Sequence, residues 1–193
     1  ILHQAQPAQF TVFAEKNALR KHIAELKAGY TGEELHVFSE QIMSNLEQLN
    51  SFRQAKTVFI YHSMPQEVHT HELIKKYSGE KVFLLPVVTK SGLILKRYNS
   101  DKELQISDFG IFEPTGPEFT EYEKIDLIVV PGAAFDRSLN RMGYGKGYYD
   151  GILQKTDAQR VAVCFDFQLL KCVPHTHFDV KMNLIVCQTE IIS

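Results

Sequence analysis

The sequence lacks the features of several protein classes. Its 193 residues include 21 basic and 23 acidic side chains, so there is no basic excess of the kind that binds nucleic acid. No apolar run approaches the roughly 18 residues that a membrane-spanning helix needs. The first residues, ILHQAQPAQF, have no basic segment followed by an apolar one, as a signal peptide would. We therefore expect a cytoplasmic protein that binds neither nucleic acid nor membrane.

Cysteine is also scarce. The chain has three cysteines and no CxxC pair: Cys164, Cys172 and Cys187. Their number is odd, and two of them lie in the apolar stretches VAVCFDF and NLIVCQT. This pattern indicates free, buried thiols in a reducing compartment rather than a disulfide framework or a metal site.

The chain alternates between helical and strand patterns. Apolar residues at helical spacing predict a helix over 13–29 and another after the capping box of Thr31 and Glu34. Weaker helical patterns cover 69–78 and YYDGILQK. Strands are predicted at 57–62, 81–88 and 93–98 and in the runs IDLIVVPG, RVAVCFDF and NLIVC. The segment 99–124 is irregular and too long for a plain connection.

This alternation predicts a single α/β domain over residues 1–193. It would have three layers, with helices on both faces of a largely parallel, Rossmann-like sheet. A chain of this length with 44% hydrophobic residues can bury a core without disulfides. Residues 1–11 carry no such pattern, and we expect a disordered or non-native segment there.

The stretch NRMGYGKGYYD, at 140–150, lies between a predicted strand and a predicted helix. In an α/β sheet this order places a loop at the carboxyl end of a strand, where ligands bind and helix N-termini attract anions. Three glycines let backbone N–H groups approach a ligand, and Arg141 and Lys146 add positive charge. The stretch favours a phosphate-binding loop over a mobile surface turn.

The loop matches neither of two common phosphate motifs. A P-loop needs Ser or Thr after its GK pair, whereas Gly147 follows Lys146. In the dinucleotide fingerprint GxGxxG, the third glycine would fall on Tyr148. The residues alone therefore predict an anion site of another type.

The longer stretch VPGAAFDRSLNRMGYGKGYYD closely resembles the signature of the 5-formyltetrahydrofolate cyclo-ligases, also called 5,10-methenyltetrahydrofolate synthetases. Weaker resemblances follow in the family's order: KNALR at 16–20, YHSMPQE at 61–67, FGIFEP at 109–114 and FDVKM at 178–182. Members of this family convert 5-formyltetrahydrofolate and MgATP into 5,10-methenyltetrahydrofolate, ADP and phosphate. The resemblance implies a carbon–nitrogen cyclo-ligase with ATP as co-substrate, Mg²⁺ as cofactor and small molecules as its partners.

The resemblance also implies which residues hold ATP: Lys16, Arg20, Arg141, Gly143, Tyr144, Gly145, Lys146, Gly147, Tyr148 and Tyr149. Lys16 and Arg20 are four residues apart and therefore share a helix face, which without the resemblance would be a solvated one. We expect Lys146 to lie nearest the transferred phosphoryl group, and Arg141 to act with it as a catalytic residue.

By the same resemblance, Mg²⁺ is assigned to Asp150 and Asp179, although Asp150 could also cap the following helix. Folate binding is assigned to His62, Glu67, Phe109, Tyr144, Gly145, Lys146, Gly147 and Tyr148. The resemblance implies that the Glu67 carboxylate accepts bidentately from the amino and ring N–H groups of the pterin, although from the residues alone Glu67 could equally be a solvated acid that opens the following helix. Tyr148 and Tyr149 could flank folate or adenine by stacking, or serve as ordinary packing residues.

Other signals are weaker or depart from the family pattern. The HxH pairs at 69–71 and 175–177 have no further ligands at metal spacing, so we do not expect zinc. The family usually has Gly in place of Leu139, so the turn before Arg141 is expected to differ. It often has a second acid in place of Asn183, which could weaken a subsidiary metal contact.

Two other function classes stay open. A sugar-phosphate isomerase or CoA-transferase relative could share the sheet, but it would need a catalytic base and no ATP or Mg²⁺. Fold analogy alone does not separate it from a cyclo-ligase. A folate- or nucleotide-binding module without turnover could keep the same loop, although intact Lys146, Asp150 and Glu67 argue against it. The glycine motif favours the cyclo-ligase, which we expect to be a monomer.

Overall fold

The computed structural model describes residues 7–108 and 110–193. In these residues the helices are α1 (Pro7–Ala28), α2 (Gly32–Gln48), α3 (Asn50–Gln54), α4 (His71–Tyr77) and α5 (Tyr148–Leu153). The strands are β1 (Thr57–Phe59), β2 (Val82–Thr89), β3 (Gly92–Arg97), β4 (Leu104–Ile106), β5 (Phe112–Pro114), β6 (Glu118–Phe119), β7 (Leu127–Val130), β8 (Ala134–Asp136), β9 (Arg141–Met142), β10 (Gln159–Val163), β11 (Leu169–Leu170), β12 (Leu184–Val186) and β13 (Ile191–Ile192). None of these helices is long and apolar enough to cross a bilayer.

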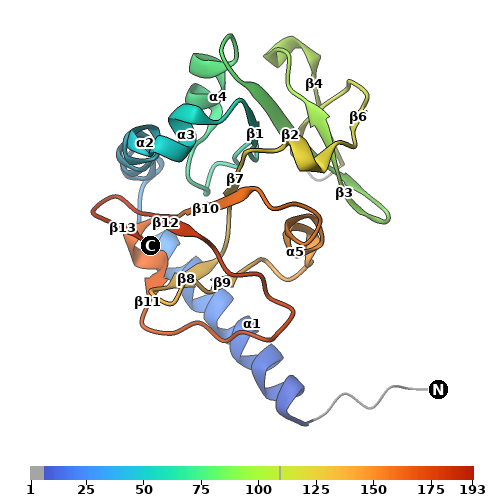
Figure 1. The fold of residues 1–193 in the computed structure, drawn as a ribbon. Helices are drawn as coiled ribbons and strands as arrows, with labels where there is room; N and C mark the ends of the chain where they lie inside the picture. The colour runs from blue at the N-terminus through green and yellow to red at the C-terminus, as the bar shows by residue number, and fades with distance from the viewer. Residues whose placement is uncertain (1–6, 109) are drawn as a thin grey trace, which may run out of the picture.

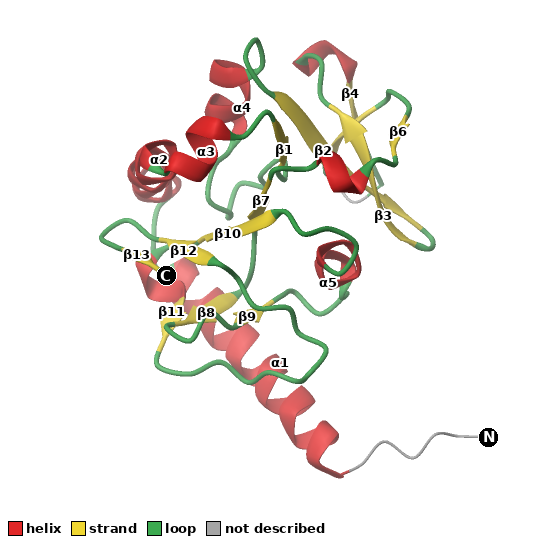
Figure 2. Cartoon of the chain, in the orientation of Figure 1, coloured by secondary structure: helices red, strands yellow, loops and turns green. Residues whose placement is uncertain are grey.

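The described residues form one 8-stranded sheet in the order β13-β12-β10-β7-β1-β2-β3-β6 (Figure 2). Strands β12, β10, β7, β1 and β2 run parallel, whereas β13, β3 and β6 pair antiparallel at the two edges. The strand order reverses between β1 and β7, and ligands bind at such a switch point in open α/β sheets. The predicted α/β fold with a largely parallel sheet is confirmed.

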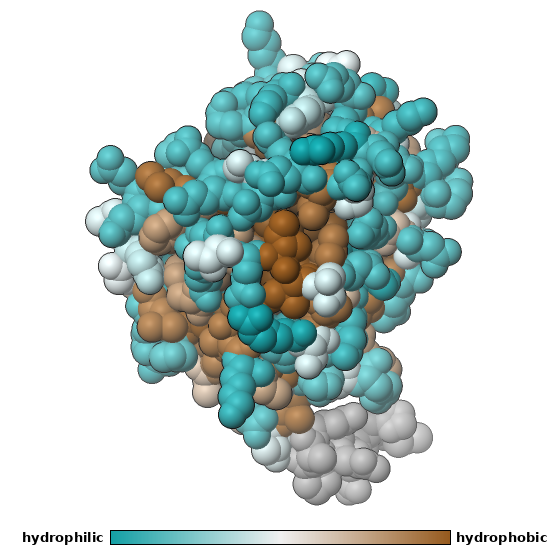
Figure 3. Space-filling model, turned by 60° about the vertical axis from the view of Figure 1, so that its left-hand side comes forward, coloured by the Kyte–Doolittle hydropathy of each residue, from teal (hydrophilic) through white to brown (hydrophobic). Residues whose placement is uncertain are grey.

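Both faces of the sheet are covered, with α2, α3 and α4 on one side and α5 on the other (Figure 1). In β7, Leu127 and Val129 pack in the cluster that contains α2, α3 and α4, and Ile128 and Val130 pack in the cluster that contains α5. Burying one such side chain contributes roughly 1.5–3 kcal/mol, so both layers fix the register of this strand. On the surface, Figure 3 shows apolar side chains gathered in a central patch that hydrophilic ones border.

A smaller sheet, in the order β11-β8-β9, lies beside α1 (Figure 1). Ile23 of α1 packs in one cluster with Ala134 of β8 and Met142 of β9. The hairpin β8–β9 turns around the buried Asp136, whose carboxylate accepts hydrogen bonds from the Ser138 and Asn140 backbone N–H groups. This packing places α1 against the segment that leads into the glycine loop.

The sequence predictions were right for most elements and missed the short ones. The capping box of α2 is confirmed: Thr31 Oγ1 accepts from the Glu34 N–H, and the Thr31 N–H donates to Glu34 Oε2. Helix α1 begins at Pro7, so it includes part of the 1–11 segment that was expected to be disordered; residues 1–6 lie outside the described residues. Strands β4, β5 and β6 lie in the segment that was expected to be irregular, and α3, β8, β9, β11 and β13 were not predicted.

Candidate active site

A cavity of about 280 Å³ lies at the switch point, beyond the carboxyl ends of β1 and β7. Its walls come from the segment after β1, from Pro131 after β7, from the β2–β3 hairpin and from the glycine loop at residues 143–147. The lining residues are Tyr61, His62, Met64, Glu67, Pro86, Val88, Leu93, Ile111, Pro131, Arg141, Gly143, Tyr144, Lys146, Gly147, Tyr148, Tyr149 and Asp150. Apolar side chains and most of the predicted site residues therefore line the same cavity.

The glycine loop is held against α1 rather than free. Arg20 Nε donates to the Gly143 carbonyl oxygen at 2.9 Å. A Cβ at Gly145, where φ is 103°, would lie 3.4 Å from the Arg20 guanidinium carbon. Only glycine adopts this backbone without strain, so the loop and the guanidinium pack directly on each other. The pKa of Arg20 is lowered by burial, which the nearby Asp179 charge partly offsets.

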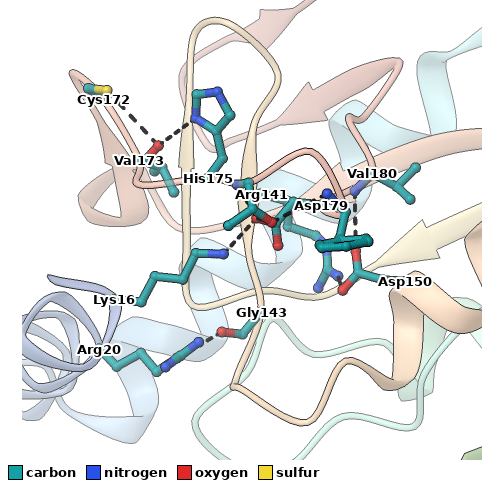
Figure 4. Close-up of polar contacts among 12 residues, drawn as sticks. Lys16, Arg20, Arg141, Gly143, Asp150, Cys172, Val173, His175, Asp179 and Val180 are labelled. Atoms are coloured by element: carbon teal, nitrogen blue, oxygen red, sulfur yellow. Dashed lines mark hydrogen bonds and ion pairs between the residues drawn. The ribbon is translucent and has the colours of Figure 1, made fainter. Parts of the chain in front are cut away.

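Lys16 lies four residues before Arg20, on the same face of α1, and reaches the segment before β12 (Figure 4). Its Nζ lies 2.6 Å from Asp179 Oδ2, which also accepts from the Thr176 N–H at 2.6 Å. Burial would raise the pKa of Asp179, but the bonds from Lys16 and Thr176 bring it below its usual range. The two predicted ATP-binding residues of α1 thus meet a predicted metal-binding residue and the glycine loop.

Arg141 and Asp150 form a second pair beside the first (Figure 4). The Arg141 side chain is 4% exposed, and its Nη2 donates to Asp150 Oδ2 at 2.9 Å. The other oxygen of Asp150 accepts from the Val180 N–H at 3.3 Å, next to Asp179. Asp150 therefore does not cap α5, whose N-cap is Gly147 with no side-chain hydrogen bond. The two predicted metal ligands are brought together through Val180.

Lys146 differs from these cations because it is exposed, lines the cavity and forms no ion pair with any described side chain. Tyr144 hydrogen-bonds the Gly132 carbonyl oxygen at 3.2 Å, and burial of its hydroxyl raises its pKa. The Tyr149 ring stacks on Phe59 at a centroid distance of 5.3 Å, as expected of a packing residue. Tyr149 also lines the cavity, together with Tyr148.

Two of the residues predicted to bind folate, His62 and Glu67, lie in the segment after β1 and line the cavity with the glycine loop. Glu67 Oε2 accepts from the Met64 N–H at 2.9 Å, so one carboxylate oxygen already has a backbone partner. His62 stacks on His71 at 3.8 Å between ring centroids, and burial, with the His71 charge, lowers its pKa to about 4. His62 also lines a second cavity of about 870 Å³ that adjoins the first. Phe109 lies outside the described residues.

The histidines of the two HxH pairs contact different partners in the structure. His69 faces His36, with their Nδ1 atoms 3.2 Å apart, whereas His71 faces His62. His175 hydrogen-bonds the Val173 carbonyl oxygen. Among the described residues, no group of three or more His, Cys, Asp or Glu side chains could hold a metal ion.

Two of the three cysteines are buried and one is exposed. Cys164 and Cys187 are buried free thiols, as expected, with their Sγ atoms 3.4 Å apart. Cys172 is exposed, so the expectation of burial is wrong for this thiol. It lies in the open segment between β11 and β12 rather than in an apolar strand.

Both departures from the family pattern have a structural consequence. Leu139 has φ 65°, the left-handed conformation that glycine adopts without strain, so the turn keeps the glycine-type backbone with a leucine in it. Asn183 Oδ1 accepts from the Arg160 N–H at 2.8 Å, so its side chain ties the residue before β12 to β10.

Sequence reasoning missed two neighbours of the site. Phe112 of β5 packs against His62 at 5.5 Å between ring centroids, and the Gln168 amide donates to the carbonyl oxygen of Gly132, the residue that Tyr144 also contacts. Phe112 lies within the FGIFEP stretch that resembles the family, which was the available signal for it. Gln168 belongs to no quoted motif and reaches the site through long-range packing.

Comparisons with known proteins bear on the family of this chain. Residues 12–188 match the 5-formyltetrahydrofolate cyclo-ligase family. The chain belongs to this family. It is 29% identical over 177 residues to the 5-formyltetrahydrofolate cyclo-ligase of Haemophilus influenzae, covering 87% of this chain and 95% of that protein. The enzyme of that name from Saccharomyces cerevisiae is 31% identical over 206 residues, with 90% and 95% covered.

A solved structure extends the likeness to the fold. The NMR structure of Aquifex aeolicus 5,10-methenyltetrahydrofolate synthetase superposes with a TM-score of 0.83 and 33% identity, covering 92% of this chain and 91% of that one. The resemblance deduced from the glycine stretch is therefore confirmed for the family and for the fold.

Proposed function

We propose that this protein is a cyclo-ligase that converts 5-formyltetrahydrofolate to 5,10-methenyltetrahydrofolate while ATP becomes ADP and phosphate. One observation supports this most: two bases of α1, the glycine loop and the acids Asp150 and Asp179 converge beside a cavity that Glu67 also lines. A sugar-phosphate isomerase would not need this number of basic groups beside paired acids.

The chemistry needs an activated formyl oxygen. The N5-formyl group is an amide, so its carbonyl carbon resists attack by N10. Transfer of the γ-phosphoryl group to the formyl oxygen makes that oxygen a leaving group. N10 then attacks the formyl carbon, the C–O bond breaks as phosphate departs, and N10 loses its proton as the five-membered ring closes.

The protein's main task in such a transfer is alignment and charge neutralisation. Lys16 and Arg20 would hold the phosphate chain from one side, and the N–H groups of the 143–147 loop from the other. Lys146 is exposed and has no ion-pair partner among the described residues, which leaves it free to meet the γ-phosphate in its proposed catalytic role. Arg141, which is held by the Asp150 carboxylate and the Pro131 carbonyl, would fix the loop and contribute charge.

The acids fit a magnesium ion that is shared with ATP. Mg²⁺ takes one or two carboxylates plus phosphate oxygens and water, and Asp150 and Asp179 supply such a pair. When bound, it would neutralise charge on the phosphate oxygens. The present partners of these acids, Arg141 and Lys16, would then be shared with the phosphates.

Folate would occupy the apolar side of the cavity. Pro86, Val88, Leu93 and Ile111 line it and would pack against the flat pterin. The second oxygen of Glu67 would accept the pterin N–H groups, and His62 would form part of the wall. We further propose that the chain folds as one domain and acts as a cytoplasmic monomer. Size-exclusion chromatography with light scattering measures its mass in solution and tests whether it is a monomer.

The proposal is tested by mixing the protein with 5-formyltetrahydrofolate and MgATP and following the near-ultraviolet absorbance of the methenyl product. We expect growth of this band only with ATP. Lys146→Ala should lower kcat/KM about 100-fold or more, because a charge aimed at the transferred group is lost. Lys102→Ala, an exposed lysine away from the cavity, is the matched control.

The control outcomes separate the alternatives. No band with the wild-type protein, although folate binds, would make it a binding module without turnover. A band that grows equally well without ATP, or an Lys146→Ala variant that matches Lys102→Ala, would contradict the proposed role of the loop.

A further inference from the structure

His36 and His69 bring two imidazole rings together on the rim of the second cavity, the one of about 870 Å³. Their Nδ1 atoms lie 3.2 Å apart, although the residues are 33 positions apart in the chain. His36 belongs to α2, and His69 lies in the segment between β1 and α4. Neither residue lines the smaller cavity of the proposed active site, so the pair is a feature separate from that site.

The backbone holds the two rings in place. Ser39, which follows His36 by three residues on α2, is 2% exposed, and its hydroxyl oxygen accepts from the His69 backbone N–H at 3.0 Å. The same hydroxyl donates to the Leu35 carbonyl oxygen at 2.7 Å, which fixes it on the helix. Residues three apart share a helix face, so His36 lies beside the point where the segment of His69 is attached. The rings therefore face each other on a rigid support.

The outer nitrogen of each ring faces an oxygen. His69 Nε2 lies 3.3 Å from the Pro65 carbonyl oxygen, and His36 Nε2 lies 3.7 Å from Glu40 Oε1. A carbonyl and an ionised carboxylate only accept hydrogen bonds, so each Nε2 is satisfied when it carries a proton. In a neutral ring the lone pair then lies on Nδ1, and the two Nδ1 atoms are the ones that face each other.

This arrangement suits a metal ion better than a hydrogen bond between neutral rings. A hydrogen bond would need a proton on one Nδ1, which would turn the Nε2 lone pair of that ring towards an oxygen. A metal ion instead binds both Nδ1 lone pairs and leaves both outer N–H groups as donors, as is usual for histidine ligands. With Zn–N bonds of about 2.0–2.1 Å, two ligand nitrogens at a tetrahedral angle lie about 3.3 Å apart, close to the observed separation.

The two nitrogens also select the class of ion. Imidazole suits Zn²⁺, Cu²⁺ and Ni²⁺, whereas Mg²⁺ and Ca²⁺ prefer oxygen ligands. Among residues 7–108 and 110–193, no group of three or more His, Cys, Asp or Glu side chains could hold a metal ion, so water or an anion would fill the other positions. The HxH spacing plays no part, because His71 faces His62 instead.

We propose that His36 and His69 form a two-histidine site for a divalent transition-metal ion at the rim of the second cavity. The bound ion links α2 to the segment that carries Glu67 and so stabilises the folded chain. The inference does not rest on the proposed function, because neither histidine lines the active-site cavity.

Zn²⁺ is the probe, because it has no redox chemistry that would oxidise the free thiols. Its binding to the full chain is measured by calorimetry at pH 8, where imidazole is ordinarily neutral, with Mg²⁺ in excess to occupy carboxylate sites. We expect one Zn²⁺ at this site. His36→Ala and His69→Ala each remove one of the two ligands and should weaken its binding at least about tenfold, the smallest loss typical of even an outer-shell change.

Control variants and a second measurement separate this site from others. His22→Ala removes an exposed histidine of α1, and Cys172→Ser and His175→Ala change other candidate ligands; all three should keep this binding. Saturating Zn²⁺ should raise the urea midpoint of wild type more than that of His36→Ala, because an ion that binds only the folded state stabilises it. His36 is exposed, so this variant keeps the test decisive even if His69→Ala does not fold.

The outcomes either support the site or overturn it. If Zn²⁺ binding is lost in His175→Ala or Cys172→Ser but kept in His36→Ala, the ion binds elsewhere and the inference is wrong. If wild type binds no Zn²⁺ at pH 8, the two rings share only a hydrogen bond or a proton, which also overturns it. Neither outcome depends on the methenyl assay, so failure of this inference and failure of the proposed function are distinguishable.

Discussion

Arg141 is the residue whose loss should most disturb the architecture of the site. Its Nη2 donates to Asp150 Oδ2 at 2.9 Å and its Nη1 to the Pro131 carbonyl oxygen at 3.2 Å. Arg141→Met removes the charge and both donors while it keeps most of the stem. Removing one partner of a buried ion pair costs about 3–5 kcal/mol. Asp150 is 22% exposed and can be partly solvated, so we expect about 2–3 kcal/mol.

Two further substitutions test whether the cost comes from the pair. Arg141→Lys keeps the charge and loses the planar fork, so we expect it to cost about 1–2 kcal/mol, the value of one charged hydrogen bond. Asp150→Asn leaves Arg141 without its counter-charge. The double variant Arg141→Met/Asp150→Asn should cost less than the sum of the two single variants, by about 1–2 kcal/mol.

Urea denaturation followed by circular dichroism measures these costs. Arg137→Met is the matched control, because Arg137 lies in the same hairpin and pairs with Glu190, but its side chain is 64% exposed. Exposed pairs contribute about 0–1 kcal/mol. If Arg141→Met were no more destabilising than Arg137→Met, Arg141 would not fix the loop, and its geometry in the site would need another cause.

Four more substitutions follow from the structure. Leu139→Gly relieves about 1 kcal/mol of strain in the left-handed backbone but loses the packing of a half-buried side chain. Because these effects oppose each other, the free energy of unfolding should change by less than about 1 kcal/mol. Leu153→Ala, 1% exposed, should cost about 2–5 kcal/mol. Burial lowers the pKa of His62 from the ordinary 6.5 to about 4, so between these pH values the unfolded chain binds more protons than the folded one. Stability should therefore fall as pH falls from 6.5 to 4, and His62→Asn should flatten this fall in urea titrations at several pH values. Lys16→Met should raise the KM for ATP about tenfold or more, with the KM for folate within about twofold, because the charge that holds the phosphates is lost.

Local patterns in the sequence predicted the long elements well because each depends on its own residues. The capping box of Thr31 and Glu34 fixed the start of α2, and the continuous apolar run of β7 indicated a strand buried on both faces. The short strands β8, β9 and β11 depend instead on contacts distant in sequence, such as the Val173 N–H that donates to Asp136. No local pattern encodes such a contact.

The site shows the same division. The glycine loop suggested a phosphate site from residues alone, and the family resemblance supplied Lys16, Arg20, Glu67 and Asp179. That Asp179 meets Lys16, 163 residues away, follows only from the packing of α1 against the core.

The most direct test of the account follows the formyl oxygen. The protein is given MgATP and 5-formyltetrahydrofolate labelled with ¹⁸O in the formyl group, and the phosphate released is analysed by mass spectrometry. Phosphorylation of that oxygen predicts one ¹⁸O in each phosphate, with one ADP formed for each methenyl product. Unlabelled phosphate, with the label found in water, would contradict the account, because ring closure would then proceed without a phosphorylated formyl group.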